Sequence, residues 1–393
     1  MRKLFAKDNS IQPLPFAVYY YTVVFLVLVG LLVSLYLSYS HFRVYTDIGY
    51  KSFCAISKAI NCDTVSQSAY SIFLGLPVPV WGTVGYIFFL LFLLIAKNKD
   101  AQKKRIWNLL FLIAAAFTLY SIILAAISTF HIHSYCIMCM VLYAVNLLLL
   151  FYTRMIRSRF KSSGLIEGLK KDIQFLQTRR SFVLRMFTPF LVGIVLVLLF
   201  FPAYWQFDPP VLHSKLKSGM TKDGHPWIGA ENPKLIITEY TDYKCFQCKK
   251  MHFFLRQLIA GHPDKIRLIH RNFPMDHSVN PIVKEPFHVG SGKIALMAIH
   301  AANQNKFWQM NDLLFEMAGE SDVIDVRKLA ARLEMDPKTL AGSVNDRSAR
   351  LQLQQDILSG LKLQISGTPA YVINENLYLA QIPPEIIKTA LGD

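Results

Sequence analysis

The sequence predicts a membrane bundle of five α-helices followed by a separate α/β domain. Of the 393 residues, 53% are hydrophobic and only 17% are charged, which is too apolar for one ordinary soluble protein. The apolar residues concentrate in five stretches of about 20 residues, the length that crosses the hydrocarbon core of a bilayer. Beyond them, strand-like and helix-like patterns follow one another at ordinary polarity. The expected spans are roughly 16–39, 79–96, 106–127, 134–153 and 186–206.

The net charge of +16 lies almost entirely in the membrane half. Up to residue 206 there are 20 Lys and Arg against 6 Asp and Glu, a net of +14, and beyond it 22 against 20, a net of +2. The basic residues gather at Arg2, Lys3 and Lys7 and in the loops 97–105 and 154–185. These are alternate connections, and loops rich in Lys and Arg stay in the cytoplasm. We therefore interpret the charge as a topology signal and expect no nucleic-acid partner.

This orientation places residues 207–393 outside the cytoplasm, together with the loops 40–78 and 128–135. Every cysteine then lies in or beside the oxidising compartment where disulfides persist. The first span is longer than the apolar region of a signal peptide and lacks a small-residue cleavage site, so we expect it to remain as an anchor. The predicted location is the cytoplasmic (inner) membrane, multi-pass, with the N-terminus in the cytoplasm and the C-terminal domain in the periplasm.

The expected domains are a membrane domain, a basic linker with the fifth span, a tether and a soluble domain. In the first outer loop, residues 54–68 predict a short helix on the membrane, and 74–82 (LGLPVPVWG) a turn into the second span. Apolar residues at helical spacing in the basic linker fit an interfacial helix, although a solvated linker fits equally well. The boundaries are 1–153, 154–206, 207–219 and 220–393.

The sequence of the soluble domain predicts a strand, a helix that begins with Cys-Phe-Gln-Cys, a second strand, a helical block, a hairpin and a final helix. The strands are KLIITEY (234–240) and IRLIHRNF (266–273), the helical block spans 290–360, the hairpin turns around Asn374–Asn376, and the last helix starts at Pro384.

The pair Cys245 and Cys248 predicts redox chemistry. A thiolate at a helix N-terminus is stabilised by free backbone N–H groups and by the helix dipole, and a second Cys one turn on can close a disulfide. Thr368-Pro369 precedes a strand, as a cis-proline loop packed against such a pair would. Glu239 is expected to face Cys248 and take its proton. Zinc would need another ligand pair, which this domain lacks.

The pair Cys136 and Cys139 stands where an outer loop becomes the fourth span. His131 and His133 nearby would permit a zinc site by residue type. We expect no metal, because Cys139 already lies within a membrane helix. A structural staple is the alternative, but a disulfide across one helical turn closes a tiny loop and stabilises little.

Tyr143 and Asn146 share a helix face with Cys139. Polar groups at this depth face protein or a ligand, since lipid cannot satisfy their hydrogen bonds. A quinone ring with two carbonyl acceptors suits such a pocket.

The motifs ITEYTDYKCFQC, KFWQMNDLLF and SGTPAYVI resemble the thioredoxin superfamily, and the helical insertion points to its DsbA-like branch. The resemblance covers about 220–393. It implies that Cys245 attacks or accepts the substrate and that Cys248 resolves the mixed disulfide. The dipeptide Phe246-Gln247 differs from the Pro-His of the best-known members, which leaves the oxidising strength open.

The C-x7-C loop, the CDTVSQS that overlaps it and CIMCMVLYAVN resemble the vitamin K epoxide reductase (VKOR) family over about 16–153, whose core has four helices. Bacterial members carry a fused thioredoxin-like domain. The resemblance implies that Cys136 and Cys139 lie beside a quinone, with Cys139 nearest the ring. Cys54 and Cys62 would shuttle between that pair and the thioredoxin-like domain, and Ser68 would help position the quinone.

The sequence thus predicts a quinone-dependent thiol:disulfide oxidoreductase that forms disulfides in secreted or periplasmic proteins. Electrons would pass from substrate thiols through three cysteine pairs to membrane ubiquinone or menaquinone. Two alternatives stay open: a quinol-linked disulfide reductase or isomerase using the same residues, and a non-enzymatic membrane-tethered peptide-binding chaperone.

Overall fold

The computed structural model describes residues 14–57, 59–97, 106–159, 164–207, 216–317 and 324–392. The basic N-terminal residues, nearly all of the 97–105 loop and most of the expected tether, Asp208-Pro209-Pro210 included, lie outside these ranges. The chain forms two compact units, one reaching Ala203 and the other running from Tyr204, with Asp47–Gly49 assigned to the second.

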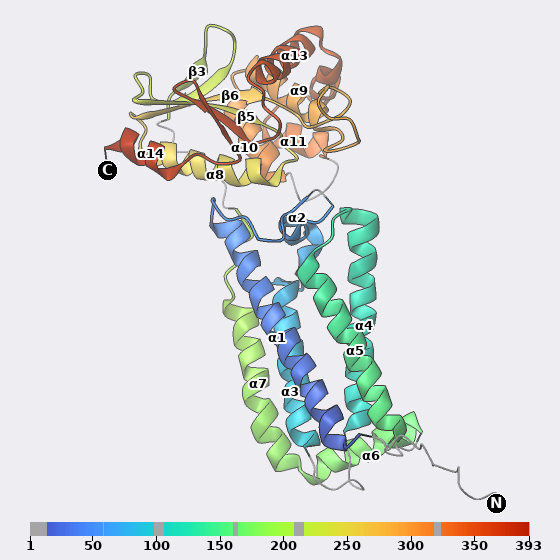
Figure 1. The fold of residues 1–393 in the computed structure, drawn as a ribbon. Helices are drawn as coiled ribbons and strands as arrows, with labels where there is room; N and C mark the ends of the chain where they lie inside the picture. The colour runs from blue at the N-terminus through green and yellow to red at the C-terminus, as the bar shows by residue number, and fades with distance from the viewer. Residues whose placement is uncertain are drawn as a thin grey trace, which may run out of the picture. The chain divides into compact units, whose positions relative to one another are not determined.

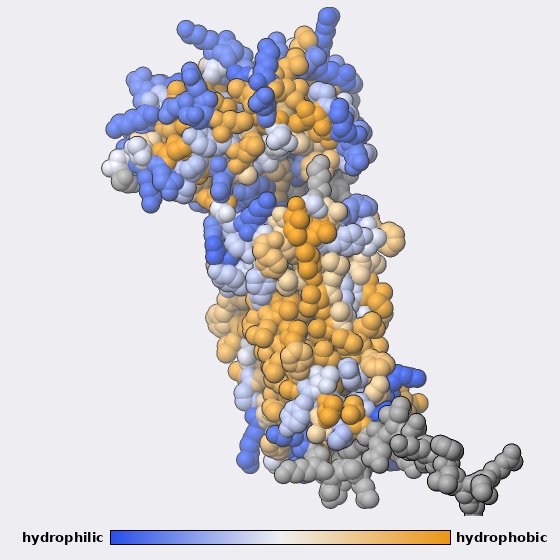
Figure 2. Space-filling view, in the orientation of Figure 1, coloured by the Kyte–Doolittle hydropathy of each residue, from blue (hydrophilic) through white to orange (hydrophobic). Residues whose placement is uncertain are grey.

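The first unit contains five helices that are long and apolar enough to cross a membrane, as predicted. Figure 2 shows hydrophobic side chains covering much of their visible surface. The fifth helix ends earlier than the predicted 206, because the residue before Pro202 is disfavoured in helical conformation. The helices are α1 (Phe16–Thr46), α3 (Val78–Ala96), α4 (Trp107–Ile127), α5 (Ile137–Arg159) and α7 (Arg180–Phe200).

Helices α1, α3, α4 and α5 pack together around a buried apolar core (Figure 1). Val27, Phe89 and Leu149 are fully buried in it. At Gly30 on α1, an added Cβ would lie 2.4 Å from the ring of Tyr86 on α3. The two helices therefore approach closely at this level because residue 30 is glycine.

The outer connections hold the predicted short helix and turn. Helix α2 (Cys62–Gln67) starts later than expected, at the point where the Asn61 side chain accepts two backbone N–H groups and caps it. A hairpin of β1 (Ile72–Phe73) and β2 (Leu76–Pro77) leads directly into α3.

The basic linker forms helix α6 (Leu165–Thr178), so the structure shows the helical alternative. Its buried side chain is polar: the Asp172 carboxylate accepts the backbone N–H groups of Asn108 (3.0 Å) and Leu109 (3.2 Å). Ile166 remains 74% exposed. Helix α6 therefore docks through a cap on α4, and not through its apolar residues alone.

The second unit is a six-stranded sheet with helices, ordered β3-β4-β6-β5-β7-β8. Strands β5 and β6 run parallel and every other neighbouring pair is antiparallel. The β3–β4 hairpin was not predicted, because its short strands contain Gly and Pro, which normally indicate a loop. The strands are β3 (Ser218–Met220), β4 (Pro226–Gly229), β5 (Leu235–Thr241), β6 (Ile266–Asn272), β7 (Ala370–Ile373) and β8 (Asn376–Leu379).

The predicted helices are present. Helix α13 packs on β6 and α9, and α10 packs on α8 and α9. The helices are α8 (Phe246–Gly261), α9 (Ser291–Ala302), α10 (Phe307–Met317), α11 (Val326–Arg332), α12 (Pro337–Gly342), α13 (Arg347–Lys362) and α14 (Pro384–Leu391).

Strand pairing brings two distant loops together. Strand β5 ends at Thr241 just before the Cys-x-x-Cys segment, and β7 begins at Ala370 just after Pro369. Because the two strands are antiparallel, with Tyr240 opposite Ala370, these loops meet at the same edge of the sheet.

Candidate redox site

A cavity of about 350 Å³ lies among the helices of the membrane unit. Its lining is mostly apolar, which suits a hydrophobic ring. The sequence predicted five residues beside a quinone in this unit, which we call the inner site. All five line the cavity: Ser68, Cys136, Cys139, Tyr143 and Asn146.

Asn146 is held by two residues that the sequence reading missed. The Tyr86 hydroxyl donates to its Oδ1 at 2.7 Å, and its Nδ2 donates to the Ser121 hydroxyl at 2.9 Å. The other amide hydrogen of Asn146 has no hydrogen-bond partner among the residues that the structure describes. The sequence did contain a signal for Tyr86 and Ser121, because each is a polar side chain within an apolar span.

Cys54 and Cys62, which the resemblance paired as a shuttle, form a disulfide, and the other four cysteines are free thiols. Cys54, Cys62 and Cys136 belong to one buried cluster. The disulfide loop is tied to the residue before Cys136, since the Asn61 N–H donates to the Tyr135 carbonyl (3.0 Å) and the Tyr135 N–H to that of Ala59 (2.8 Å). These two backbone hydrogen bonds hold the segment before Cys62 beside the residue before Cys136.

Cys136 and Cys139 occupy the start of α5. The backbone N–H of Cys139 donates to the Cys136 sulfur at 3.3 Å. This is the arrangement in which a helix N-terminus stabilises a thiolate. Of the two, Cys136 therefore gains the helix-end donor, and Cys139 lies one turn further into the bundle.

Cys245 has the same position at the start of α8. The backbone N–H of Cys248 donates to its sulfur at 3.4 Å, and its thiol donates to the Thr368 carbonyl at 3.4 Å. The Thr368–Pro369 peptide is cis. The neighbouring Cys248 thiol, with help from His288, lowers the pKa of Cys245 to about 7. Burial raises the pKa of Cys248 well above its ordinary value.

His288 and Asp242 are further residues at this site that the sequence reading missed. His288 Nδ1 lies 2.9 Å from Asp242 Oδ2, and the carbonyl of Asp242 accepts the backbone N–H of Cys245. Burial alone would lower the pKa of His288, but the hydrogen bond and the charges of Asp242 and Cys245 outweigh it and raise it. No sequence motif pointed to His288, because 43 positions separate it from Cys245.

Glu239 is fully buried on β5. Its hydrogen-bond partner among the described residues is His270, opposite it on β6, with Oε1 2.7 Å from Nδ1. The predicted transfer of a proton from Cys248 to Glu239 therefore involves a carboxylate that already has a histidine partner.

Comparisons with known proteins agree with this division of the chain. A vitamin K epoxide reductase family model matches residues 21–154, and a thioredoxin model matches residues 221–393. These matches cover the membrane unit with the inner cysteine pairs and the unit with Cys245 and Cys248.

Individual relatives are distant. The "Na(+)/H(+) antiporter NhaA 3" of Salinispora tropica is 27% identical over 146 residues, which is 37% of this chain and 21% of that protein. The chain thus spans about a fifth of the antiporter's length. "Disulfide bond formation protein D" of Bacillus subtilis is 22% identical over 39% of this chain and 69% of that protein. The crystal structure of oxidised BdbD from Bacillus subtilis is 22% identical, covering 45% of this chain and 99% of that one, with a TM-score of 0.35.

Both family matches and the cysteine geometry agree on thiol–disulfide chemistry. The chain therefore joins a vitamin K epoxide reductase family domain, residues 21–154, to a thioredoxin-like domain, residues 221–393, and has five helices that are long and apolar enough to cross a membrane.

Proposed function

We propose that the protein is a thiol oxidase that forms disulfides in reduced secreted or periplasmic proteins and passes their electrons to a membrane quinone. The observation that carries this proposal is the membrane cavity, where Cys136 and Cys139 lie with Tyr143 and Asn146, next to a formed Cys54–Cys62 disulfide. A staple would need neither a cavity nor polar groups around it.

Electrons enter at the Cys245–Cys248 disulfide. A substrate thiolate attacks Cys245, Cys248 leaves as a thiolate and takes a proton, and the second substrate thiol closes the substrate disulfide. The Cys245 thiolate then attacks Cys54 and expels Cys62. Cys248 attacks Cys245, which restores their disulfide and frees Cys54. Each step exchanges one S–S bond for another.

Within the membrane unit, Cys62 attacks Cys136 of an oxidised inner pair and Cys139 leaves as a thiolate. Cys54 then attacks Cys62, which restores their disulfide and frees Cys136. A closed Cys54–Cys62 disulfide beside free Cys136 and Cys139 thiols supports this order of exchange. The backbone bridge between Asn61 and Tyr135 supports the attack of Cys62 on Cys136.

The residues around the cavity fit a quinone, either ubiquinone or menaquinone. Tyr143 and the remaining amide hydrogen of Asn146 would donate to its carbonyl oxygens, Ser68 would help position it, and the apolar lining would hold its ring. When bound, the quinone supplies the two-electron oxidation that re-forms the Cys136–Cys139 disulfide.

The test is anaerobic oxidation of a reduced test protein by the purified full chain, with and without a soluble quinone analogue. We expect more than one disulfide per resident disulfide of the chain only with quinone, and loss of this multiple turnover in Cys139→Ala. Equal oxidation without quinone would sink the proposal. The redox state of Cys245 and Cys248 in cells decides the direction of flow: a pair that is mostly disulfide supports the oxidase, and a pair that is mostly dithiol indicates a reductase or isomerase.

A further inference from the structure

Asp63 in the membrane unit carries a buried carboxylate oxygen that the cysteine steps above do not use. The residue directly follows Cys62 in helix α2, where the Asn61 side chain accepts its backbone N–H at 2.9 Å. The backbone N–H of Ser52 donates to its Oδ2 at 3.1 Å. Its other oxygen, Oδ1, is shielded from solvent and has no hydrogen-bond partner among the residues that the structure describes. A buried acceptor without a partner costs free energy, so this oxygen needs an explanation.

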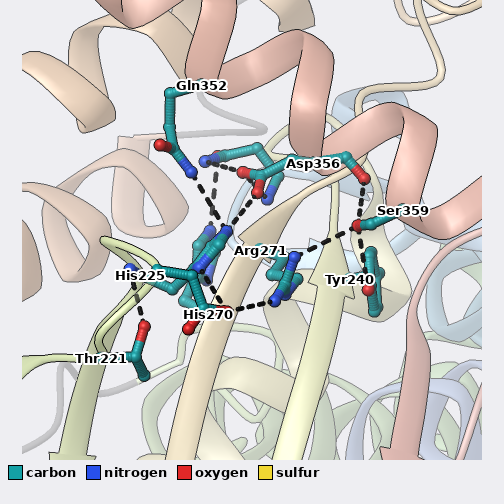
Figure 3. A network of polar contacts seen from close by, with 10 residues as sticks. Thr221, His225, Tyr240, His270, Arg271, Gln352, Asp356 and Ser359 are labelled. Carbon is teal, nitrogen blue, oxygen red and sulfur yellow. Dashed lines mark hydrogen bonds and ion pairs between the residues drawn. The ribbon is translucent and has the colours of Figure 1, made fainter.

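A carboxylate with a purely structural role has different surroundings, as Asp356 on α13 of the second unit shows. Its Oδ1 lies 2.7 Å from His225 Nε2, and its Oδ2 accepts the backbone N–H of Asn272 at 3.0 Å. Figure 3 shows the polar contacts that surround Asp356. Both of its oxygens are therefore occupied, whereas Asp63 keeps one oxygen open.

Ser52 connects Asp63 to Cys54 and Cys62, which we call the shuttle pair. The hydroxyl of Ser52 lies 3.5 Å from the Cys54 sulfur, while its backbone N–H holds the Asp63 carboxylate. The negative charge of Asp63 also acts through space on the thiol of Cys136. Asp63 is therefore linked to the sulfur atoms at both ends of the exchange within the membrane unit.

This exchange needs a proton acceptor inside the protein. Cys54, Cys62 and Cys136 are 0%, 2% and 3% exposed and belong to one buried cluster. A thiol attacks only as its thiolate, so the attacking sulfur must lose its proton at a place that solvent does not reach. Tyr36 packs against the same cluster, but a phenol keeps its proton at neutral pH. The open oxygen of Asp63 is better suited, because a carboxylate accepts a proton there.

We propose that Asp63 is the proton acceptor of the shuttle pair. When Cys54 attacks Cys62 in its mixed disulfide with Cys136, the S–H proton of Cys54 moves to Asp63 and the Cys54–Cys62 bond forms. The bond between Cys62 and Cys136 breaks, Cys136 leaves as a thiolate, and Asp63 returns the proton to it. Asp63 is a carboxylate before and after the step, and one S–S bond has replaced another.

This proposal rests on the proposed role of the shuttle pair, and an assay of the full chain without quinone tests it. The other four cysteines are changed to serine, the chain is reduced in detergent, and one equivalent of dipyridyl disulfide is added. The first pyridinethione is released when one shuttle thiol attacks the reagent, at a rate that rises with reagent concentration. The second is released when the other thiol closes the Cys54–Cys62 disulfide. This closure is intramolecular, so its rate does not depend on reagent concentration.

We expect Asp63→Asn to slow closure by about tenfold or more, because general-base assistance contributes about 10²–10⁴-fold in full. Asparagine keeps an oxygen for the Ser52 N–H but does not take up a proton. Asp63→Ala should also be slow, and added formate, a small carboxylate, should raise its closure rate. The matched control is Asp172→Asn, which removes another buried carboxylate of the membrane unit and should leave the closure rate unchanged.

An unchanged closure rate in Asp63→Asn would overturn the proposal. Slow closure in Asp63→Ala that formate does not raise would overturn it as well, because a structural role alone gives that result. If Asp63→Ala does not fold, Asp63→Glu takes its place and must close faster than Asp63→Asn. Failure of the proposed function looks different: the unmodified chain would then show no quinone-dependent multiple turnover, whatever the closure rates of these variants.

Discussion

At the scale of single residues, the reactivity of this protein depends on where a helix N-terminus meets a sulfur atom. Cys136 and Cys245 each receive the backbone N–H of the cysteine three positions later, at 3.3 and 3.4 Å. Both spacings were readable in the sequence, because Cys-x-x-Cys at a helix start places the second cysteine one turn on. The groups that shift the pKa values of these thiols could not be predicted from the sequence, since they come from distant segments.

His288 is such a tuning group, and it gives a pH prediction. The pKa of Cys245 is about 7, so alkylation of the reduced chain by iodoacetamide should rise with pH through about 7 and then level off. His288→Gln removes a positive charge and should move the midpoint upward. His300→Gln, at a partly buried histidine near the end of α9, is the control.

The pKa of Cys245 also influences the reduction potential of the Cys245–Cys248 disulfide. Because the pKa of Cys245 is lowered from 9.0 to about 7, the thiolate stabilises the reduced folded form in full above pH 9, and this stabilisation is lost as the pH falls through 7. His288→Gln should therefore make the Cys245–Cys248 disulfide less oxidising, by about 30 mV for each pKa unit lost. An unchanged alkylation midpoint and potential would contradict this role.

At the scale of elements, the close contact of α1 and α3 sets the inner site. Gly30→Ala would place a methyl group against the Tyr86 ring and displace the hydroxyl that holds Asn146. We expect a loss of about 1–3 kcal/mol in unfolding free energy and a larger proportional loss of quinone-dependent activity. Gly193→Ala on α7, with nothing within 4 Å, is the control and should change neither. Thermal unfolding and oxidase assays measure both; full activity in Gly30→Ala would refute the role of this contact.

Helix α6 carries a separate stability prediction. Asp172 caps the start of α4, so Asp172→Ala should lower the unfolding free energy by about 1–2 kcal/mol. Glu167→Ala on the same helix, exposed and paired with Lys171, should leave the unfolding free energy nearly unchanged, because solvent screens an exposed ion pair. Denaturant unfolding in detergent compares the two, and equal losses would show that the cap adds nothing.

Element type was largely predictable, and element contacts were not. Long apolar runs and strand–turn–helix patterns identified the five spans and most of the second unit. The β3–β4 hairpin was missed because its strands have three and four residues and contain Gly and Pro. Tyr86 and Ser121 were missed because periodicity shows that a residue shares a face with others, but not which helix meets that face.

At the scale of the whole molecule, one chain contains three thiol pairs with different surroundings. Cys245 has a helix-end donor and a buried partner in Cys248, Cys54 and Cys62 form a closed disulfide, and Cys136 and Cys139 line an apolar cavity. The cavity residues predicted from sequence meet there because Cys136, Cys139, Tyr143 and Asn146 lie on one helix. The order of transfer between the three pairs is the proposed one, from Cys245 and Cys248 through Cys54 and Cys62 to Cys136 and Cys139.

The most direct test of that order is disulfide mapping of the full-length Cys248→Ser variant. Without Cys248, the Cys245 thiolate can attack Cys54 but the mixed disulfide cannot be resolved toward the outer pair. In the presence of quinone, which keeps the Cys136–Cys139 pair oxidised so that Cys62 is captured by Cys136 and cannot expel Cys245, mass spectrometry should find Cys245 linked to Cys54. A link from Cys245 to Cys136 or Cys139, or no internal link at all, would contradict the proposed route.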